Sequence, residues 1–421
     1  MQFENFIEAH SAMLWGAFII ALVMGAVVNK TNFCTMGAVS DFVNMGDTGR
    51  LRAWLFAIAV AVVGVSVLEY FGLADPDNAF PPYRGSLLLV AENVFGGLLF
   101  GIGMTLASGC GNKTLIRIGG GNLKSLVVFF IIGVIAYFMV NPFPGSDKTL
   151  MSVLFYDWIR PLSVDMGASQ DLGTVVAGEE QALVGRIAIG LLIGVALFWF
   201  AFKSTDFRGN RDHILGGLVV GLAVLAAWYV TSNIQIDADG EVLSLSEYYE
   251  QWDMLADSEE GKPAAQRPLA PQSFTFINPL GQSLGYLASG FQASLLTFGV
   301  VAVAGVILGS FLYALISRGF RFEWFSSGRD FVNHVIGGVL MGFGGVLAMG
   351  CTIGQAITGI STLAIGSMLT FGAIFLGSAL TMKVQYYKMV YEEEASFFKA
   401  LITGLVDLRL LPQSLRQLEA I

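Results

Sequence analysis

Two of the three cysteines in the chain stand at matching positions of a repeated sequence pattern. Cys110 ends a glycine-rich stretch that starts at Gly96, and Cys351 ends a similar stretch that starts at Gly337. A cysteine that recurs in this way inside apolar sequence indicates a thiol site on an internal two-fold axis rather than ordinary packing. The residues of the first stretch that recur at one constant offset in the second are Gly96, Gly97, Leu99, Gly101, Gly103, Leu106, Ala107, Gly109 and Cys110.

The sequence around these two cysteines predicts broken helices. Gly109 and Gly111 flank Cys110, and two glycines around one residue disfavour a continuous helix. A break exposes backbone N–H groups, which attract anions and stabilise a thiolate. At membrane depth such a break is tolerated only where it lines a cavity or is buried in protein. We therefore expect Cys110 and Cys351 to line a path for an anion or a sulfur compound.

The third cysteine, Cys34, lies in the polar segment that follows the first apolar run. Residues 16–34 align loosely with residues 216–234, where no cysteine stands opposite Cys34. A single membrane cysteine is more often a small buried apolar residue, but the matched pair makes binding the preferred hypothesis here. The candidate substrate-binding residues are the three cysteines and their neighbours: Cys34, Cys110, Cys351, Gly109, Gly111, Asn112, Gly350, Thr352 and Gln355.

Other residues that could carry chemistry give weaker signals. Asn112 and Gln355 are equally consistent with donors to a substrate and with helix caps. Three cysteines could bind a soft metal, but Cys-x-x-Cys spacing is absent and the three histidines are isolated, so we expect no metal and no cofactor. Lys113 and Arg117 could attract an anion, although basic residues at such positions more often anchor membrane topology.

The composition places the chain in a bilayer. Of its 421 residues, 55% are hydrophobic and only 13% are charged, and apolar runs long enough to cross the hydrocarbon core recur along it. The formal net charge of −9 says little about partners, because the distribution of charge matters more, but no basic patch or nucleic-acid motif appears, so we expect no nucleic-acid partner. The first ten residues hold no Lys or Arg, so we expect the first apolar run to be a retained helix and not a signal peptide.

The apolar runs predict an all-α polytopic membrane protein with nine transmembrane helices and short broken or re-entrant helices at its centre. Residues 141–183 and 232–287 interrupt the runs with many acidic side chains and read as loops or small external caps. The expected helices lie near residues 12–29, 53–72, 92–109, 125–140, 184–203, 213–231, 288–316, 332–349 and 364–382.

Basic residues predict the orientation. Lys or Arg residues follow every odd-numbered helix, so those ends are expected in the cytoplasm. The N-terminus and the acidic loops then face outward, and the C-terminus faces inward. We expect a first repeat in residues 1–141, an outer loop and connector helix in 142–211, and a second, inverted repeat in 212–382 that contains the acidic loop 232–287. An amphipathic cytoplasmic tail is expected in residues 383–421.

Three short motifs together resemble the YeeE/YedE family of bacterial sulfur-transport proteins. They are Asn32-Phe33-Cys34, Gly109-Cys110-Gly111 and Gly350-Cys351-Thr352-x-Gly354, and the resemblance extends over about residues 12–382. It implies an hourglass of helices in the bacterial inner membrane that imports thiosulfate into the cytoplasm. It also implies that Cys34, Cys110 and Cys351 pass the substrate along by transient S–H···S contacts. A small cytoplasmic sulfurtransferase of the TusA type is the partner that the family implies.

Two alternatives to thiosulfate import stay open from the sequence. Some relatives of this family are associated with selenium, so a selenium compound or another reduced sulfur species could be the substrate. A membrane thiol redox enzyme or sulfurtransferase is the less favoured alternative, because Cys-x-x-Cys, flavin and quinone motifs are missing. No ATP-binding motif appears either, so we expect a transporter that is not an enzyme and does not hydrolyse ATP.

Overall fold

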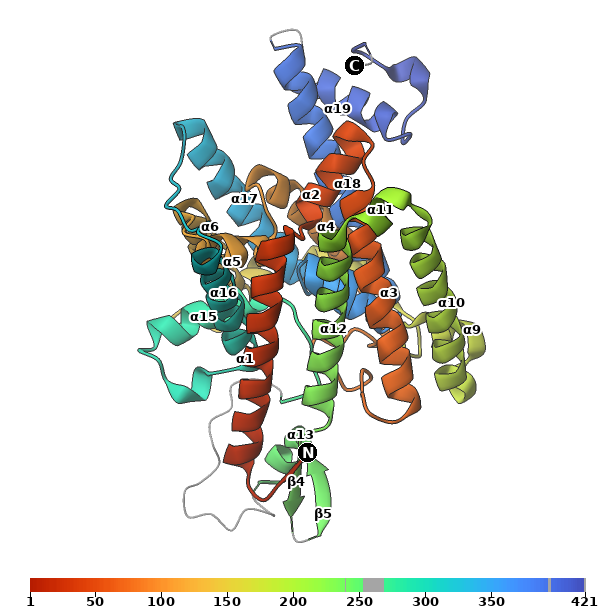
Figure 1. The fold of residues 1–421 in the computed structure, drawn as a ribbon, viewed down its shortest axis with the longest axis vertical. Helices are drawn as coiled ribbons and strands as arrows, with labels where there is room; N and C mark the ends of the chain where they lie inside the picture. The colour runs from red at the N-terminus through yellow and green to blue at the C-terminus, as the bar shows by residue number, and fades with distance from the viewer. Residues whose placement is uncertain (239, 253–268, 393–394, 420–421) are drawn as a thin grey trace.

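A computed structural model describes residues 1–238, 240–252, 269–392 and 395–419 of the chain. Helices make up 71% of it and strands 4%, which confirms the expected all-α class. The two termini lie at opposite ends of the long axis (Figure 1). The described residues hold nine helical segments long and apolar enough to cross a membrane. Their main helices are α1 (Phe6–Thr31), α3 (Gly49–Tyr70), α4 (Val90–Leu106), α6 (Leu123–Val140), α10 (Ala182–Lys203), α12 (Arg211–Ser232), α16 (Phe298–Ile316), α17 (Gly328–Leu347) and α18 (Ile365–Val390).

The prediction of a seventh helix at residues 288–316 is wrong for the first third of that range. The structure ends α15 (Ile277–Ala288) where that helix was expected to begin, and α16 starts only at Phe298. Between them Gly290 and Phe291 have left-handed backbone angles of +74° and +67°, which no helix can continue through. Since α15 packs against α6 and α16, part of the expected acidic loop belongs to the helical bundle.

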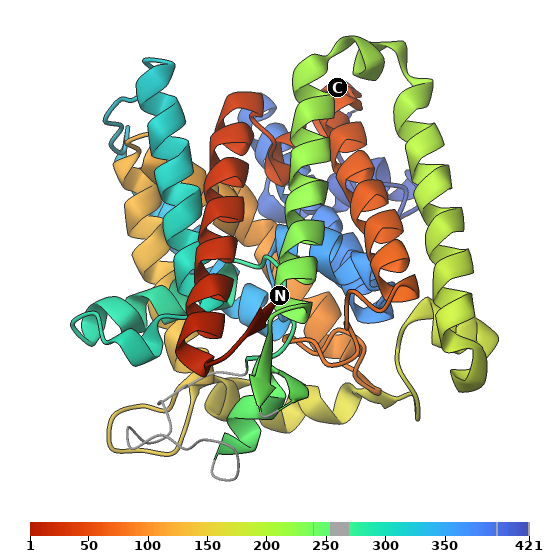
Figure 2. The same cartoon turned by 60° about the horizontal axis from the view of Figure 1, so that its bottom comes forward.

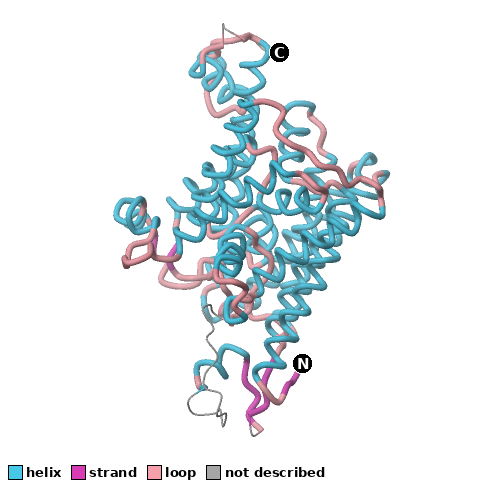
Figure 3. Tube along the Cα trace, turned by 90° about the vertical axis from the view of Figure 1, so that its left-hand side faces the viewer, coloured by secondary structure: helices cyan, strands magenta, loops and turns pink. Residues whose placement is uncertain are grey.

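The end that carries the N-terminus is covered by short elements. β1 (Gln2–Phe3) pairs in parallel with β4 (Gln235–Ala238), which pairs antiparallel with β5 (Glu241–Ser244), as Figure 3 shows at that end. A second ribbon joins β2 (Leu87–Leu88) to β3 (Val164–Asp165). Asp239, Asp253, Glu259 and Glu260 of the acidic loop lie outside the described residues. The short helices at this end are α7 (Leu150–Leu154), α8 (Tyr156–Ile159), η2 (Arg160–Leu162), α9 (Leu172–Ala177), η3 (Glu179–Gln181), α13 (Leu245–Glu250) and η4 (Ala293–Leu295).

The repeated glycines bring α4 and α17 into direct backbone contact. A Cβ on Gly96 would lie 2.8 Å from the Gly344 carbonyl oxygen, and a Cβ on Gly337 would lie 2.6 Å from the Gly103 carbonyl oxygen. The contact on α17 moves from Gly344 back to Gly337 as the contact on α4 moves forward from Gly96 to Gly103, so the two helices run antiparallel. Small residues permit this close approach between membrane helices. The contact is reciprocal, as an inverted repeat predicts; the assignment of residues 1–141 and 212–382 as the two halves stays a prediction.

The remaining long helices pack on this pair or on one another. α1 packs against α16 and α12, and α3 packs between α12 and α10. α18 packs on α4, while α6 packs on α17. Figure 2 shows the long helices side by side, with α10 at one edge of the bundle. The pair α4 and α17 is therefore held by α18 and α6, and Cys110 and Cys351, which follow the ends of α4 and α17, are buried.

A buried charge network holds the segment that follows Cys351. The Arg84 guanidinium donates to the Thr362 carbonyl oxygen at 2.8 Å and pairs with Glu69 at 2.6 Å. Asp77 joins Arg84 to Arg186, at 3.2 Å and 2.9 Å. This network fixes the outer end of the short helix that begins at Cys351, because Thr362 lies just beyond it.

Asp171 completes this network beside Leu363. Its carboxylate pairs with Arg186 at 2.9 Å, and the next residue, Leu172, donates its backbone N–H to the Leu363 carbonyl oxygen. Burial alone would raise the pKa of Asp171, but hydrogen bonds from Arg186, Thr174 and Ser169 lower it to about 2. The carboxylate is therefore ionised at neutral pH and neutralises the buried Arg186.

The C-terminal tail extends beyond the helical bundle. α19 (Phe397–Asp407) packs on the end of α18, and a 3-10 turn, η6 (Gln413–Leu415), follows it (Figure 1). Asp407 accepts a hydrogen bond from Tyr387 at 2.7 Å and pairs with Arg416. The tail is helical, as its spacing predicts, and its position on the membrane surface stays a prediction.

Candidate functional site

All three cysteines occupy the same position in the backbone, at the first turn of a short helix. The carbonyl oxygen of each cysteine accepts a hydrogen bond from the backbone N–H four residues further on, at 2.8 to 3.0 Å. The breaks predicted at Cys110 and Cys351 are therefore present, and Cys34 has one too. The short helices that follow Cys34, Cys110 and Cys351 are α2 (Thr35–Ser40) with the π-turn η1 (Asp41–Met45), α5 (Gly111–Gly119), and the π-helix η5 (Ile353–Gly359).

The chain enters each of these breaks through a left-handed residue two positions before the cysteine. The φ angles are +51° at Asn32, +57° at Ser108 and +55° at Met349. Non-glycine residues seldom adopt this conformation, and it ends a helix sharply. The sequence interpretation placed the break on the flanking glycines and treated Cys34 as an unsymmetric third thiol. A shared Cys-Thr-x-Gly signal, Cys34 to Gly37 and Cys351 to Gly354, could have revealed the likeness.

The breaks meet at the centre of the protein, with Cys110 between the other two cysteines. The Cys110 thiol lies near both Cys34 and Cys351. A Cβ on Gly111 would lie 3.9 Å from the Cys351 Cβ, so the two breaks lie within van der Waals reach of each other. The exposed fractions are 7% for Cys34, 2% for Cys110 and 0% for Cys351, and all three thiols are free. The site is therefore a row of three buried thiols.

Backbone N–H groups and hydroxyls surround the two deepest thiols. The N–H groups of Gly354, Phe276 and Ile353 and the Thr275 hydroxyl face the Cys351 thiol, and the Thr352 hydroxyl faces the Cys110 thiol. Neither hydroxyl closes a hydrogen bond in the structure. Donors arranged in this way around a thiol suit an anion.

Several polar atoms beside the cysteines are buried without a hydrogen-bond partner in the described part of the chain. They are the hydroxyls of Thr275, Thr352 and Tyr83 and the Oδ1 atom of Asn112. An unpaired buried polar group costs free energy, on the order of 1–3 kcal/mol, so a cluster of them marks a place for a polar ligand. Burial raises the pKa of the Tyr83 hydroxyl, which keeps it protonated and able to donate.

The other predicted site residues shape the breaks. The Gln355 amide donates to the Ala348 carbonyl oxygen at 2.5 Å and accepts from Ser367 at 2.6 Å, so both of its polar ends are engaged in bracing η5 against α17 and α18. A Cβ on Gly350 would lie 3.2 Å from the Thr275 hydroxyl oxygen, and one on Gly109 would lie 3.2 Å from the Lys113 side chain. These glycines therefore leave space for side chains that face the thiols.

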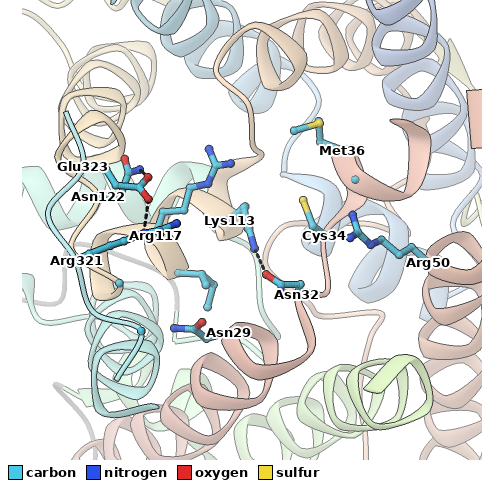
Figure 4. A pocket seen from close by; sticks show the side chains of 14 residues that line it. Asn29, Asn32, Cys34, Met36, Arg50, Lys113, Arg117, Asn122, Arg321 and Glu323 are labelled. Atoms are coloured by element: carbon cyan, nitrogen blue, oxygen red, sulfur yellow. Dashed lines mark hydrogen bonds and ion pairs between the residues drawn. The ribbon is translucent and has the colours of Figure 1, made fainter. Parts of the chain in front are cut away.

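A cavity of about 400 Å³ lies beyond Cys34, on the side of the basic loops. Figure 4 shows Cys34, Lys113 and Arg50 around this space, with Lys113 hydrogen bonded to Asn32 at 3.3 Å. The polar and ionisable residues of its lining are Asn29, Asn32, Cys34, Arg50, Lys113, Arg117, Asn122, Arg321 and Glu323. We call this space the basic cavity.

Four cations and one carboxylate line the basic cavity. Glu323 pairs with Arg321 at 2.7 Å, and Arg50 pairs with Asp41 at 3.3 Å. Lys113 and Arg117 have no ion-pair partner within the described residues. The sequence interpretation favoured these two as topology anchors, whereas the structure directs them to the space beside Cys34. A cavity with two uncompensated cations attracts anions.

A second cavity, of about 190 Å³, lies on the side of the N-terminus. Its lining includes Thr275 and Met349, which lie near Cys351. It also includes Pro81, Pro82 and Gln272. We call it the outer cavity. The three thiols therefore lie between two cavities on opposite sides of the bundle. From the outer cavity the order is Cys351, Cys110 and Cys34, ending at the basic cavity.

The arrangement of the thiols does not suggest a metal centre. Within the described ranges, no three His, Cys, Asp or Glu side chains gather in a way that could hold a metal ion. The donors around the thiols are hydroxyls, backbone N–H groups and cations, all of which complement a negative charge.

Comparison with known proteins fits this geometry. The sequence model of the family described as Sulphur transport matches residues 30–380, which include all three cysteines and every residue that lines the two cavities except Asn29. The chain belongs to the sulphur transport family. That family is the one that the three cysteine motifs indicate, so the resemblance is confirmed.

Two curated relatives of this sulphur transport protein carry the name thiosulfate transporter TsuA. The relative from Escherichia coli strain K12 is 24% identical over 364 residues, which cover 82% of this chain and 87% of the relative. The relative from Spirochaeta thermophila is 23% identical over 376 residues, which cover 87% of this chain and 97% of the relative. These matches cover most of the chain, and the family match at residues 30–380 includes both copies of the glycine pattern. The family and its apolar helices make this chain a multi-pass membrane protein.

Proposed function

We propose that this protein imports thiosulfate across the bacterial inner membrane through the row of cysteines. The observation that carries the proposal is the line of three buried free thiols between two cavities, with an excess of cations at one end. The names of the two curated relatives support thiosulfate as the substrate. Selenium oxyanions and other reduced sulfur anions share this chemistry and are alternatives that competition distinguishes.

The donors along the path can replace the water that a dianion loses. An unpaired dianion in hydrocarbon would be very costly, so each position must offer hydrogen bonds or positive charge. Thiols are weak, soft donors that match the terminal sulfur of thiosulfate and release it easily. Weak binding at successive positions is what conduction requires. The three thiols therefore serve as transient contacts and stay chemically unchanged.

The basic side of the bundle faces the cytoplasm in this proposal. Arg50, Lys113, Arg117 and Arg321 gather at that end, and basic segments remain on the cytoplasmic side of bacterial membranes. The N-terminus then lies outside and the C-terminus inside. Thiosulfate enters at the outer cavity and leaves by the basic cavity. A small cytoplasmic sulfurtransferase of the TusA type is the partner proposed to receive it.

Transport by the purified protein tests this function directly. Proteoliposomes that contain the protein should accumulate ³⁵S-thiosulfate, and empty liposomes should not. Unlabelled thiosulfate should compete fully, and sulfate, which lacks the soft sulfur, should compete at least about tenfold less well. Competition by selenite or sulfide at concentrations well below those that unlabelled thiosulfate requires would assign another substrate. Turnover of thiosulfate to a new sulfur species, seen by mass spectrometry, would assign an enzyme instead.

Removing the positive charge of Lys113 should weaken release into the basic cavity. Lys113→Met keeps the length of the side chain but removes the cation beside Cys34. We expect the initial rate of uptake to fall about tenfold, and the dependence of uptake on ionic strength to become weaker. Lys113→Arg should retain most of the activity. Uptake by Lys113→Met at the wild-type rate and with the wild-type salt dependence would show that this charge has no part in transport.

A further inference from the structure

The repeat gives Cys34 a counterpart on the outer side of the path, and it is Thr275. Cys34 precedes Cys110 by the same number of residues by which Thr275 precedes Cys351. The loose alignment that placed residues 216–234 opposite residues 16–34 cannot show this, because the segment between α12 and Thr275 is much longer than the one between α1 and Cys34. Thr275 therefore stands where a fourth thiol would be.

The contacts of the two residues correspond. Cys34 lies beside Lys113, three residues after Cys110, and Thr275 lies against Gly354, three residues after Cys351. A Cβ on Gly354 would lie 2.4 Å from the Thr275 hydroxyl oxygen, so only glycine leaves room for that hydroxyl.

The phenylalanines before Cys34 and Thr275 also correspond. Phe33 stacks on Trp54 of α3, with the ring centroids 4.6 Å apart, and Phe274 packs on Phe298 of α16, with the centroids 5.5 Å apart. The helices α3 and α16 are the second long helices of the two expected repeats. The same local packing therefore holds Cys34 and Thr275 in place.

The Thr275 hydroxyl is free to bind a ligand. Its oxygen is buried and has no hydrogen-bond partner in the described residues, and Thr275 lines the outer cavity. The Thr352 side chain, which is 0% exposed, has a second unpaired hydroxyl at the next step, beside Cys110. Hydroxyls are stronger and harder donors than thiols, so they match oxygen atoms, whereas thiols match sulfur.

We propose that Thr275 is a fourth substrate-binding position, which hydrogen-bonds the oxygen end of the anion while its sulfur end meets Cys351. Thr352 takes over the oxygen end one step further, at Cys110. The inference rests on the proposed function and makes it more specific. On the outer half of the path, hydroxyls therefore bind the oxygen end of this tetrahedral anion and thiols bind its soft terminal sulfur. The cations on the inner half take the place of the hydroxyls.

The test is the concentration dependence of ³⁵S-thiosulfate uptake by Thr275→Val and Thr275→Ser in proteoliposomes. Valine has the shape of threonine without the hydroxyl, so KM should rise about tenfold or more, which is the effect of one lost hydrogen bond to a charged ligand. Serine keeps the hydroxyl and should stay within about twofold of the wild type. Competition by sulfate, which binds through oxygen alone, should weaken in Thr275→Val.

Two controls separate binding from folding. Thr381→Val removes a hydroxyl that donates to the Gly377 carbonyl oxygen of its own helix, at 2.7 Å, and should leave KM unchanged. The melting temperature of Thr275→Val should match that of the wild type. A KM within twofold of the wild type in Thr275→Val, or an equal loss in Thr275→Ser, would overturn the role of this hydroxyl. If the wild type itself transports no thiosulfate, the proposed function fails, which is a different result.

Discussion

Replacing Cys110 by alanine is expected to lower thiosulfate uptake at least about a hundredfold without reducing the amount of folded protein. Cys110 lies between the other two thiols and is the point where the breaks of the two halves meet. Alanine removes the donor that matches the sulfur of the anion at this buried position. A loss of about 3 kcal/mol at the narrowest step, a reasonable value for an uncompensated charge, corresponds to this factor.

Initial rates of ³⁵S-thiosulfate uptake in proteoliposomes measure this effect, with the protein content of each preparation normalised by immunoblot. Cys110→Ser is the matched variant, because its hydroxyl keeps a donor but loses the soft match to sulfur; it should retain more activity than Cys110→Ala. Alanine in place of a buried thiol removes little volume, so the melting temperature should change by only a few degrees. Rapid uptake by Cys110→Ala would show that the anion does not pass this thiol.

The second large effect is on folding. Gly337→Val should prevent the packing of α17 on α4, because a Cβ at this position would lie 2.6 Å from both the Ala107 nitrogen and the Gly103 carbonyl oxygen. Backbone atoms in a helix cannot yield as a side chain can, so we expect a destabilisation of at least about 3 kcal/mol. Ala107 is the end of α4, three residues before Cys110, so the break would be displaced as well.

Gly372→Val is the matched control for this variant. Gly372 also lies in a long membrane helix, α18, but a Cβ there would meet no atom within 4 Å. We expect this variant to be extracted, purified and melted like the wild type, whereas Gly337→Val should aggregate or be degraded. Size-exclusion chromatography in detergent and a thermal unfolding curve distinguish the two. Equal yield and equal melting temperature for both glycine variants would show that α4 and α17 do not pack through their backbones.

The sequence predicts the class of fold and the centre of the site because both depend on local patterns. Apolar runs identify the long helices, since the thickness of the bilayer sets their length. The glycine pattern before Cys110 and Cys351 identifies the central contact, because only small residues allow helix backbones to touch. The cysteine motifs, taken together, also indicate the family correctly.

Features that depend on tertiary packing could not be read from the sequence. The left-handed residues Ser108 and Met349 are not of a type that prefers this conformation, so their residue types do not predict it. Helix α15 lies within an acidic segment whose composition suggests a loop. The likeness of Thr275 to Cys34 is hidden by the long segment before it. The role of Lys113 depends on the cavity, which forms only when residues far apart in sequence assemble.

The groups at the two ends of the row of thiols differ, so the proposed path has a direction that a symmetric repeat alone would not give. The outer half ends in the hydroxyl of Thr275, and the inner half ends in Cys34 with Lys113 and Arg117 beside it. An anion that passes from neutral donors to cations moves toward more favourable potential. These cations line the basic cavity. Water in that cavity can compete with the cations for the anion, so that the anion can leave.

Protection of the three thiols by substrate is the most direct measurement of the central claim. Methyl methanethiosulfonate is small enough to follow thiosulfate, and it converts an accessible thiol to a mixed disulfide that peptide mass spectrometry assigns to one cysteine. In proteoliposomes that transport thiosulfate, saturating thiosulfate should slow the modification of Cys34, Cys110 and Cys351 alike, and sulfate should protect much less. Unchanged modification rates at all three cysteines, in vesicles saturated with thiosulfate and still transporting it, would contradict a path along the thiols.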